Sequence, residues 1–253
     1  MHLIIGLLLS SAIGVSLGLI GGGGSIITVP VLVYVLGVDA HEAVAMSLAV
    51  VGATSVVGAW LHSRRGVVRV RTGLLFASTG IAGALGGAQL TYLVSPSVLM
   101  LSFAALMLAV AASMLIRRKS GEASELRRET HVVRAGIAGL IVGALTGFLG
   151  VGGGFLVVPA LVMFAGLTMR EAVGTSLVVI AVNCAAGLAG HMGHASFDLV
   201  LATLVTALAV VGALAGSHWS QRVSPAHLRT GFAVFVVVIA VWLVLKNTML
   251  VAI

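Results

Sequence analysis

Residues 18–30 read Gly-Leu-Ile-Gly-Gly-Gly-Gly-Ser-Ile-Ile-Thr-Val-Pro, and residues 147–159 read Gly-Phe-Leu-Gly-Val-Gly-Gly-Gly-Phe-Leu-Val-Val-Pro. The two stretches stand 129 residues apart. When the chain is compared with itself over 31 positions from Gly18 and from Gly147, 14 positions are identical. The same offset pairs all four prolines of the chain with one another. This agreement predicts that the protein contains two copies of one unit.

The composition indicates a protein whose side chains are mostly solvated by lipid. Of 253 residues, 60% are hydrophobic and only 8% are charged, whereas a soluble domain has about 25% charged residues. The formal net charge of +7 does not indicate nucleic-acid binding, because the basic residues occupy short loops between apolar runs. The single cysteine, Cys184, implies no disulfide framework.

The first twenty residues could be read as a signal peptide. They lack a basic amino-terminal region, and residues 4–21 align with the internal stretch 133–150, which cannot be cleaved. We therefore expect them to form a membrane segment of the mature protein.

Ten apolar segments divide equally between the two units. Most approach the roughly 20 residues that a helix needs to cross a bilayer core. Two of them are too short, and each short one follows a glycine cluster, so the first two segments of each unit are predicted to form a broken or re-entrant hairpin. The segments are 3–20, 25–37, 43–61, 73–94, 97–116, 132–149, 154–167, 171–190, 199–219 and 227–246.

Lysine and arginine predict the orientation of these segments, because basic residues favour cytoplasmic loops. Loops 62–71 and 117–134 are rich in arginine and are separated by two spans, so both can be cytoplasmic. The orientation then places 13 of the 14 basic residues inside, with Lys246 as the exception, and both termini outside. The prediction is a multi-pass protein of the inner or plasma membrane.

An odd number of segments in each unit gives the two copies opposite orientations. Inverted repeats with short, glycine-interrupted helices at matching positions are typical of secondary transporters. The fold class predicted is an all-α integral membrane protein of two inverted repeats. Repeat 1 covers 1–116, a polar cytoplasmic linker covers 117–131, and repeat 2 covers 132–253.

The duplicated glycine clusters are the first candidate binding elements. Glycine unwinds a helix, and freed backbone groups at membrane depth are tolerated where they are buried or line a cavity. The half-helices that start near Ser25 and Phe155 would direct amide groups at an anion. Close helix packing is the alternative reading of these glycines. The cluster residues are Gly21, Gly22, Gly23, Gly24, Gly150, Gly152, Gly153 and Gly154.

Polar residues in the third segment of each unit are the second candidates. Glu42 and Glu171 occupy equivalent first turns, where a carboxylate either gates a pathway or only complements the helix dipole. Small hydroxyls in membrane helices often bond only their own backbone, whereas an amide at mid-membrane needs partners. The candidate donors are Ser25, Thr28, Ser47, Thr54, Thr175, Ser176 and Asn183.

Equivalent positions near helix ends supply the candidates for gating or proton coupling. They are His62 and His191, together with Gln89 and His218. A histidine at a helix end either caps the helix or relays protons. We expect no metal or other cofactor, because His191-x-x-His194 alone is a weak metal motif. The sequence contains no pattern of a nucleophile with a nearby base, so it does not predict an enzyme.

The duplicated motifs resemble the TauE/SafE family of sulfite and organosulfonate exporters. The resemblance rests on Gly150-Val-Gly-Gly-Gly-Phe-Leu-Val-Val-Pro159, on Arg170-Glu-Ala-Val-Gly-Thr-Ser-Leu177, and on a histidine after the third segment. The first unit repeats this pattern, with Ala45-Met46 in place of Gly-Thr. The resemblance extends over essentially the whole chain.

The resemblance implies a carrier that exports a small sulfur-containing oxyanion, either sulfite or a short organosulfonate such as sulfoacetate, by alternating access. A passive anion channel or a non-transport membrane scaffold are the alternatives. The partners expected are this anion, the lipid bilayer and a coupled proton, with no nucleic acid. The sequence predicts no particular oligomeric state.

Overall fold

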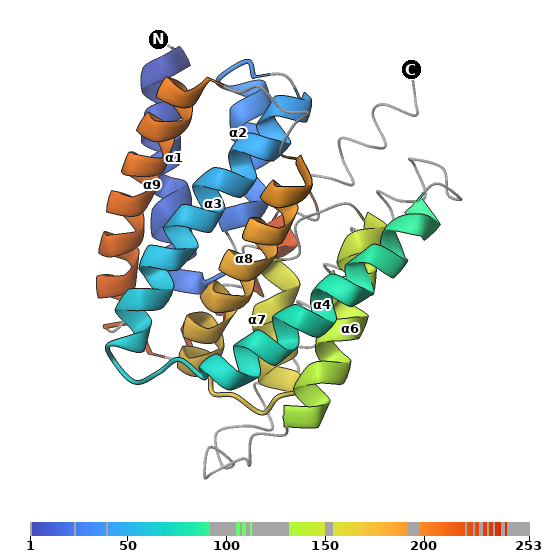
Figure 1. The fold of residues 1–253 in the computed structure, drawn as a ribbon. Helices are drawn as coiled ribbons and strands as arrows, with labels where there is room; N and C mark the ends of the chain where they lie inside the picture. The colour runs from blue at the N-terminus through green and yellow to red at the C-terminus, as the bar shows by residue number, and fades with distance from the viewer. Residues whose placement is uncertain are drawn as a thin grey trace.

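A computed structural model describes residues 2–22, 24–38, 40–91, 132–149, 154–191 and 198–220, with scattered positions in 105–112 and 222–241. This part of the chain is helical and contains no strand. The linker 117–131 and most of the predicted segments 97–116 and 227–246 lie outside it. The helices are α1 (His2–Ile20), α2 (Gly24–Tyr34), α3 (Ala40–Ser63), α4 (Val70–Thr91), α6 (Val132–Leu149), α7 (Gly154–Met163), α8 (Met169–His191) and α9 (Leu199–Trp219), shown in Figure 1.

The first glycine cluster reverses the chain between α1 and α2. Gly21 has φ +84°, a backbone conformation that favours glycine. A Cβ at Gly24 would lie 2.9 Å from the Leu17 side chain, and a Cβ at Gly6 would meet Leu36 at the far end of the hairpin. The 11 residues of α2 are too few to cross a bilayer core of about 30 Å. The predicted short helix is therefore present and returns toward the end where α1 begins.

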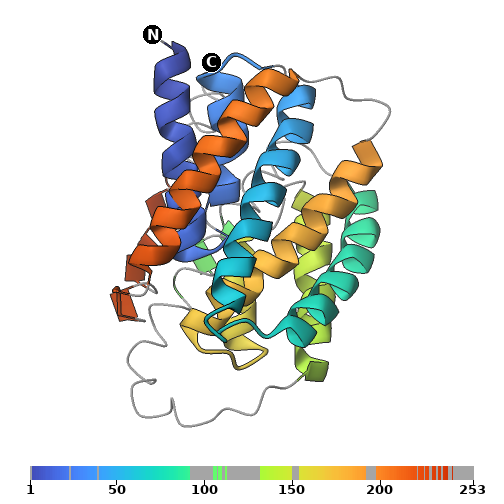
Figure 2. The same ribbon diagram turned by 60° about the vertical axis from the view of Figure 1, so that its left-hand side comes forward.

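The helices pair across the two halves of the sequence. Helix α1 lies beside α9, and α4 lies beside α6, as Figures 1 and 2 show. Under the offset of 129 residues, α1 corresponds to α6 and α4 corresponds to α9. Each pair therefore joins one helix from each half, so the halves are not two separate bundles.

Helices α3 and α8, which are equivalent under the offset, pack against each other in the antiparallel sense. A Cβ at Gly52 would lie 3.0 Å from Cβ of Cys184, and a Cβ at Gly58 would lie 3.0 Å from Leu177. From the first of these contacts to the second, the residue number rises in α3 and falls in α8, so the two helices run in opposite directions. Small residues at these positions allow the two backbones to approach closely.

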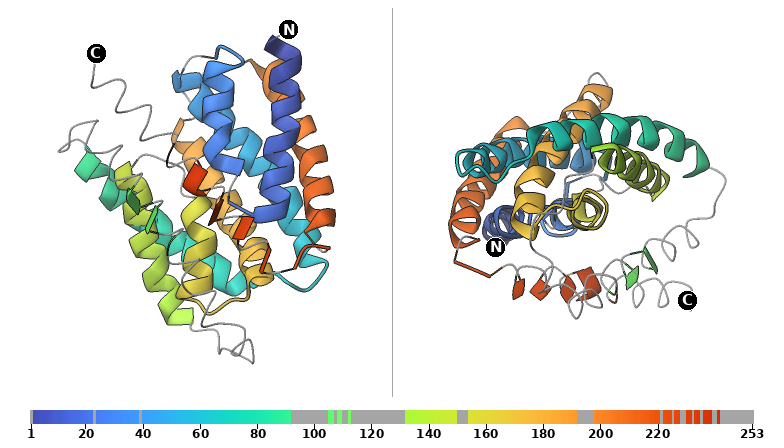
Figure 3. Two further views of the ribbon diagram at one scale, coloured as in Figure 1. Left: turned by 180° about the vertical axis from the view of Figure 1, so that it is seen from behind. Right: turned by 90° about the horizontal axis from the view of Figure 1, so that it is seen from below.

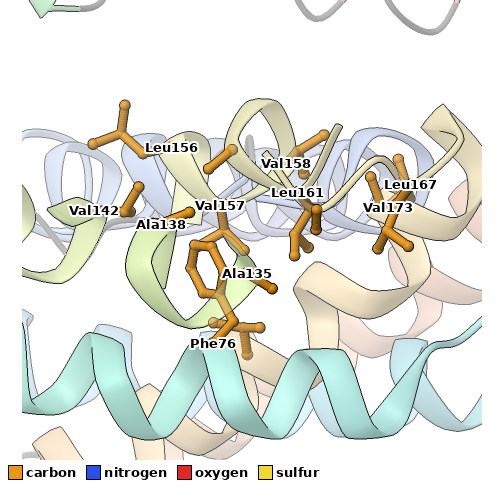
Figure 4. Close-up of a cluster of buried hydrophobic side chains, with 14 of the residues drawn as sticks. Phe76, Ala135, Ala138, Val142, Leu156, Val157, Val158, Leu161, Leu167 and Val173 are labelled. Atoms are coloured by element: carbon orange, nitrogen blue, oxygen red, sulfur yellow. The ribbon is translucent and has the colours of Figure 1, made fainter. Parts of the chain in front are cut away.

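The largest buried apolar cluster surrounds α7. Phe76 of α4, Ala138 of α6 and Val173 of α8 belong to one buried cluster with Val157 and Leu161 of α7 (Figure 4). Viewed from behind, α7 lies between the α4–α6 pair and the rest of the bundle (Figure 3). Burial on all sides explains why α7 is apolar around its whole circumference.

The outer faces of the helices are apolar as well. Leu8, Val133 and Val211 are 68%, 76% and 60% exposed, which is unfavourable in water and favourable in lipid. Within the described residues, three helices are long and apolar enough to cross a membrane: Ala45–Ser63, Met169–Leu188 and Leu199–Trp219. The arrangement is that of an all-helical membrane protein.

Candidate functional site

The turn after α1 brings the first glycine cluster against the second half of the chain. A Cβ at Gly21 would lie 2.6 Å from Oγ of Ser176 on α8 and 3.0 Å from Val158 on α7. Gly22 and Gly154 are buried, and α2 contacts α7. Two sets of predicted site residues, the glycine cluster and the α8 hydroxyl, are thus adjacent. Gly23, Gly150, Gly152, Gly153 and the side chain of Ser25 lie outside the described residues.

Three of the predicted hydroxyl donors bond their own helix. Thr28 donates to the Gly24 carbonyl at 3.0 Å, Thr54 donates to the Val50 carbonyl at 2.6 Å, and Ser176 donates to the Val173 carbonyl at 2.8 Å. This local bonding satisfies a hydroxyl in an apolar environment without help from a ligand. Ser47 is buried about two helical turns before Thr54.

Thr175 differs from the other predicted hydroxyl donors because its hydroxyl bonds a residue of the first half of the chain. Its Oγ1 accepts a hydrogen bond of 3.0 Å from the backbone N–H of Arg69, in the loop before α4. Arg69 also pairs with Glu171 near the start of α8. Thr175 therefore lies at the arginine-bearing end of the bundle, about 12 Å along α8 from Asn183.

Three buried polar atoms have no hydrogen-bond partner within the described structure: Oγ of Ser16, Oγ of Ser55 and Oδ1 of Asn183. Ser55 is 0% exposed. Ser55 and Asn183 both lie in the stretch of α3–α8 packing bounded by the Gly52–Cys184 and Gly58–Leu177 contacts. Buried polar groups are nearly always paired, so these atoms indicate a place where water or a ligand belongs.

Of these three residues, only Asn183 was predicted from the sequence. Ser16 and Ser55 were missed because a serine in a membrane helix usually bonds the preceding turn, as Ser10 does with Gly6. One signal was available for Ser55. It follows Thr54, and two adjacent hydroxyls cannot both face the same apolar surface of a helix.

The chemistry at this crossing is neutral. Residues 45–61 of α3 and 172–190 of α8 contain no Asp, Glu, Lys or Arg. The Asn183 amide presents an acceptor, and rotation by 180° would present its NH₂ donors instead. The Ser55 hydroxyl can donate one hydrogen bond. An anion in this region would be held by neutral donors and would meet no fixed carboxylate.

The predicted gating residues occupy several different environments. Glu171 forms a capping box with Thr168, accepting from its N–H at 3.0 Å, and pairs with Arg69 at 2.7 Å. His62 is buried, contacts the carbonyl of Gly58 through Nδ1 and packs against Gly174. His218 is exposed beside Arg222. Glu42 lies in the first turn of α3, as predicted. The side chains of Gln89 and His191 lie outside the described residues.

No group of three or more metal-ligating side chains occurs among the residues that the structure describes.

Replacing Gly21 by alanine is expected to destabilise the protein by about 1–3 kcal/mol. The positive φ strains any other residue, and the added Cβ would crowd Ser176. Gly37→Ala is the matched control, because Gly37 has φ +69° but nothing within 4 Å of the added Cβ. Thermal unfolding of the purified variants measures both. Equal losses in the two variants would show that the contact with Ser176 contributes nothing.

The comparisons with known proteins agree with this class of all-helical membrane protein. The family model described as "Sulfite exporter TauE/SafE" matches residues 6–243. The chain belongs to the TauE/SafE family.

Several curated relatives are similar over nearly their whole length. A "Probable membrane transporter protein" of Xylella fastidiosa is 32% identical, covering 93% of this chain and 92% of the relative. The "Probable membrane transporter protein YdhB" of Bacillus subtilis is 28% identical, covering 86% and 90%. A "Probable membrane transporter protein" of Haemophilus influenzae is 26% identical, covering 95% and 97%. No solved structure matches the chain.

Proposed function

We propose that the protein is a secondary membrane transporter that exports a small sulfur-containing oxyanion, sulfite or a short organosulfonate, by alternating access. The observation that carries this proposal is the presence of unpartnered polar atoms of Ser55 and Asn183 where two equivalent helices cross. Leaving buried polar atoms without partners costs stability, so a function is the reason to retain them. The family description and the names of the relatives support transport as that function.

The packing supports an inverted arrangement of the two halves. Equivalent helices α3 and α8 are antiparallel, and both are long enough to cross a membrane. A two-fold axis relating two antiparallel spanning helices lies in the membrane plane, which is the geometry of inverted repeats. Thr54 and Asn183, equivalent under the offset, both lie in the central stretch of this crossing. Exchange of the conformations of the two halves would then open the site to alternate sides.

Substrate recognition would combine backbone amides with neutral side chains. The starts of α2 and α7, beside the glycine clusters, would supply N–H groups and positive dipole ends to an oxyanion. Asn183 and Ser55 would supply side-chain hydrogen bonds, and Ser47 and Ser176 lie about two helical turns away on the same two helices. The glycines of the two clusters, with Glu42 and Glu171 in the first turns of α3 and α8, would shape or gate the pathway.

The proposed orientation places the arginine-bearing end of the bundle in the cytoplasm. Arg64, Arg65 and Arg69 follow α3, and Arg170 starts α8 at the same end. An inside-negative potential would then favour exit of an anion by about 2.3 kcal/mol per charge for each 100 mV, so export needs no ATP.

The direct test is radiolabelled sulfite flux in proteoliposomes of the purified full chain, with and without an imposed potential and pH gradient. Saturable flux that exchanges with trapped substrate is expected for a carrier. Flux that neither saturates nor exchanges would identify a passive channel. A folded protein that moves neither sulfite nor a panel of short organosulfonates would contradict the proposed substrate class and favour the scaffold alternative.

A further inference from the structure

Three polar contacts tie the two halves together at the arginine-bearing end. Arg69 of the first half binds Glu171 of the second through both Nε at 2.8 Å and Nη2 at 2.7 Å. The backbone N–H of Arg69 donates to Thr175. Arg65 donates to the carbonyl of Ser217 in the last turn of α9 at 2.8 Å. All three contacts join residues more than 100 positions apart.

The 129-residue offset shows what stands at the equivalent positions of the opposite end. Glu171 corresponds to Glu42, but Arg69 corresponds to Asp198. The ion pair at one end is therefore matched by two carboxylates at the other. Thr175 corresponds to Met46, which cannot accept the equivalent backbone hydrogen bond as a hydroxyl does.

The packing places these two carboxylates at the same end of the bundle. Ala43 and Met46 of α3 pack in one buried cluster with Ala202 of α9. Glu42 precedes the first of these residues, and Asp198 lies one turn before Ala202 and caps α9, accepting from Val200 N at 2.8 Å. At the arginine-bearing end an ion pair joins the starts of α4 and α8, whereas the equivalent starts of α9 and α3 carry charges of one sign here.

We infer that Arg69 and Glu171 form a latch that holds the arginine-bearing end of the bundle closed, and that the equivalent residues Glu42 and Asp198 form no such latch at the opposite end. The inference rests on the proposed alternating access, and it identifies Arg69, Arg65 and Thr175 as gate residues of that cycle. Glu171 contributes to the gate through the pair with Arg69, while its capping box with Thr168 fixes the carboxylate in place. The conformation described here is the one closed at the arginine-bearing end.

The latch is tested with one reporter cysteine at each end. Ala172 and Ala43 are equivalent, follow Glu171 and Glu42 directly, and are both 0% exposed. Ala172→Cys or Ala43→Cys is introduced with Cys184→Ala, which removes the single native cysteine. The protein is placed in nanodiscs, and its reaction with a membrane-impermeant maleimide is timed without substrate. A cysteine at a closed end reacts slowly.

Arg69→Gln is expected to raise the labelling rate of Ala172→Cys about two- to fivefold and to lower that of Ala43→Cys. Arg71→Gln, which removes an exposed arginine of the same helix start, is the matched control. Equal rates in the Arg69 and Arg71 variants would overturn the latch. Faster labelling at both ends would also overturn it, because the pair would then serve only to hold the fold together.

A second variant tests the missing latch at the other end. Asp198→Arg provides a partner for Glu42 and should slow labelling of Ala43→Cys below the rate of Asp198→Asn, which keeps a capping residue without the charge. Equal rates in these two variants would contradict the assigned asymmetry. Because labelling is measured without substrate, the labelling result can support or contradict the latch whatever the sulfite flux experiment shows.

Discussion

Gly83→Ala should lower the stability of the folded bundle by about 2–3 kcal/mol or more, whereas Gly86→Ala, one turn further along α4, should be neutral or slightly stabilising. A Cβ at Gly83 would overlap the backbone carbonyl of Leu140 on α6 and lie 2.8 Å from the Ala144 nitrogen. Backbone atoms cannot rotate away, so the two helices would have to separate. A Cβ at Gly86 meets nothing within 4 Å, and alanine is the better helix former.

Thermal unfolding and size-exclusion chromatography in detergent measure this difference. The melting temperature of Gly83→Ala should fall by on the order of 5–10 °C relative to Gly86→Ala. Gly212, the equivalent glycine on α9, faces the Ser11 carbonyl of α1 in the same way, so Gly212→Ala should behave like Gly83→Ala. If all three variants were equally stable, the described close approach of α4 to α6 and of α1 to α9 would be wrong.

Asn183→Leu should reduce saturable flux at least about tenfold without lowering thermal stability. Oδ1 of Asn183 is buried and has no hydrogen-bond partner among the described residues, so the folded protein bears the cost of removing it from water. Leucine of similar size avoids that cost, and the variant should be as stable as the parent or more so. The substrate would lose a hydrogen-bonding group, and transport would suffer.

Opposite effects on flux and on stability distinguish a binding residue from a structural one. Thr206→Val is a matched control, because Thr206 on α9 is half-buried and donates to the Ala202 carbonyl of its own helix. That variant should transport normally. An Asn183→Leu protein that is less stable but transports at the parent rate would show that Asn183 supports only the packing of α8.

The fold elements followed closely from the sequence. The predicted segments 3–20, 132–149 and 199–219 match α1, α6 and α9 within one residue at each end. Helices α3 and α8 begin two or three residues before the apolar runs 43–61 and 171–190, because polar first turns are helical as well. The Thr168–Glu171 capping box supplies the reason in α8. The family resemblance is confirmed by the match over residues 6–243.

The site was only partly predictable. Asn183 was identified because an amide in an apolar helix needs partners. The predicted donors Thr28, Thr54 and Ser176 bond their own backbones in this conformation, and a sequence does not show where a hydroxyl proton points. The roles of the glycine clusters and of His62 in transport stay predictions, as does the inverted orientation of the halves.

The sequence by itself determined the duplication, the lipid-exposed character and the positions of the short helices, because each depends on the order of residue types along the chain. Only the tertiary structure decided that α1 pairs with α9 and α4 with α6, since small-residue faces are compatible with many partners. It also decided that Arg69 meets Glu171 and that Oγ of Ser55 has no hydrogen-bond partner in the part of the chain that the structure describes. Hydrogen bonds and ion pairs between residues more than 100 positions apart depend on the relative placement of helices, which no local pattern records.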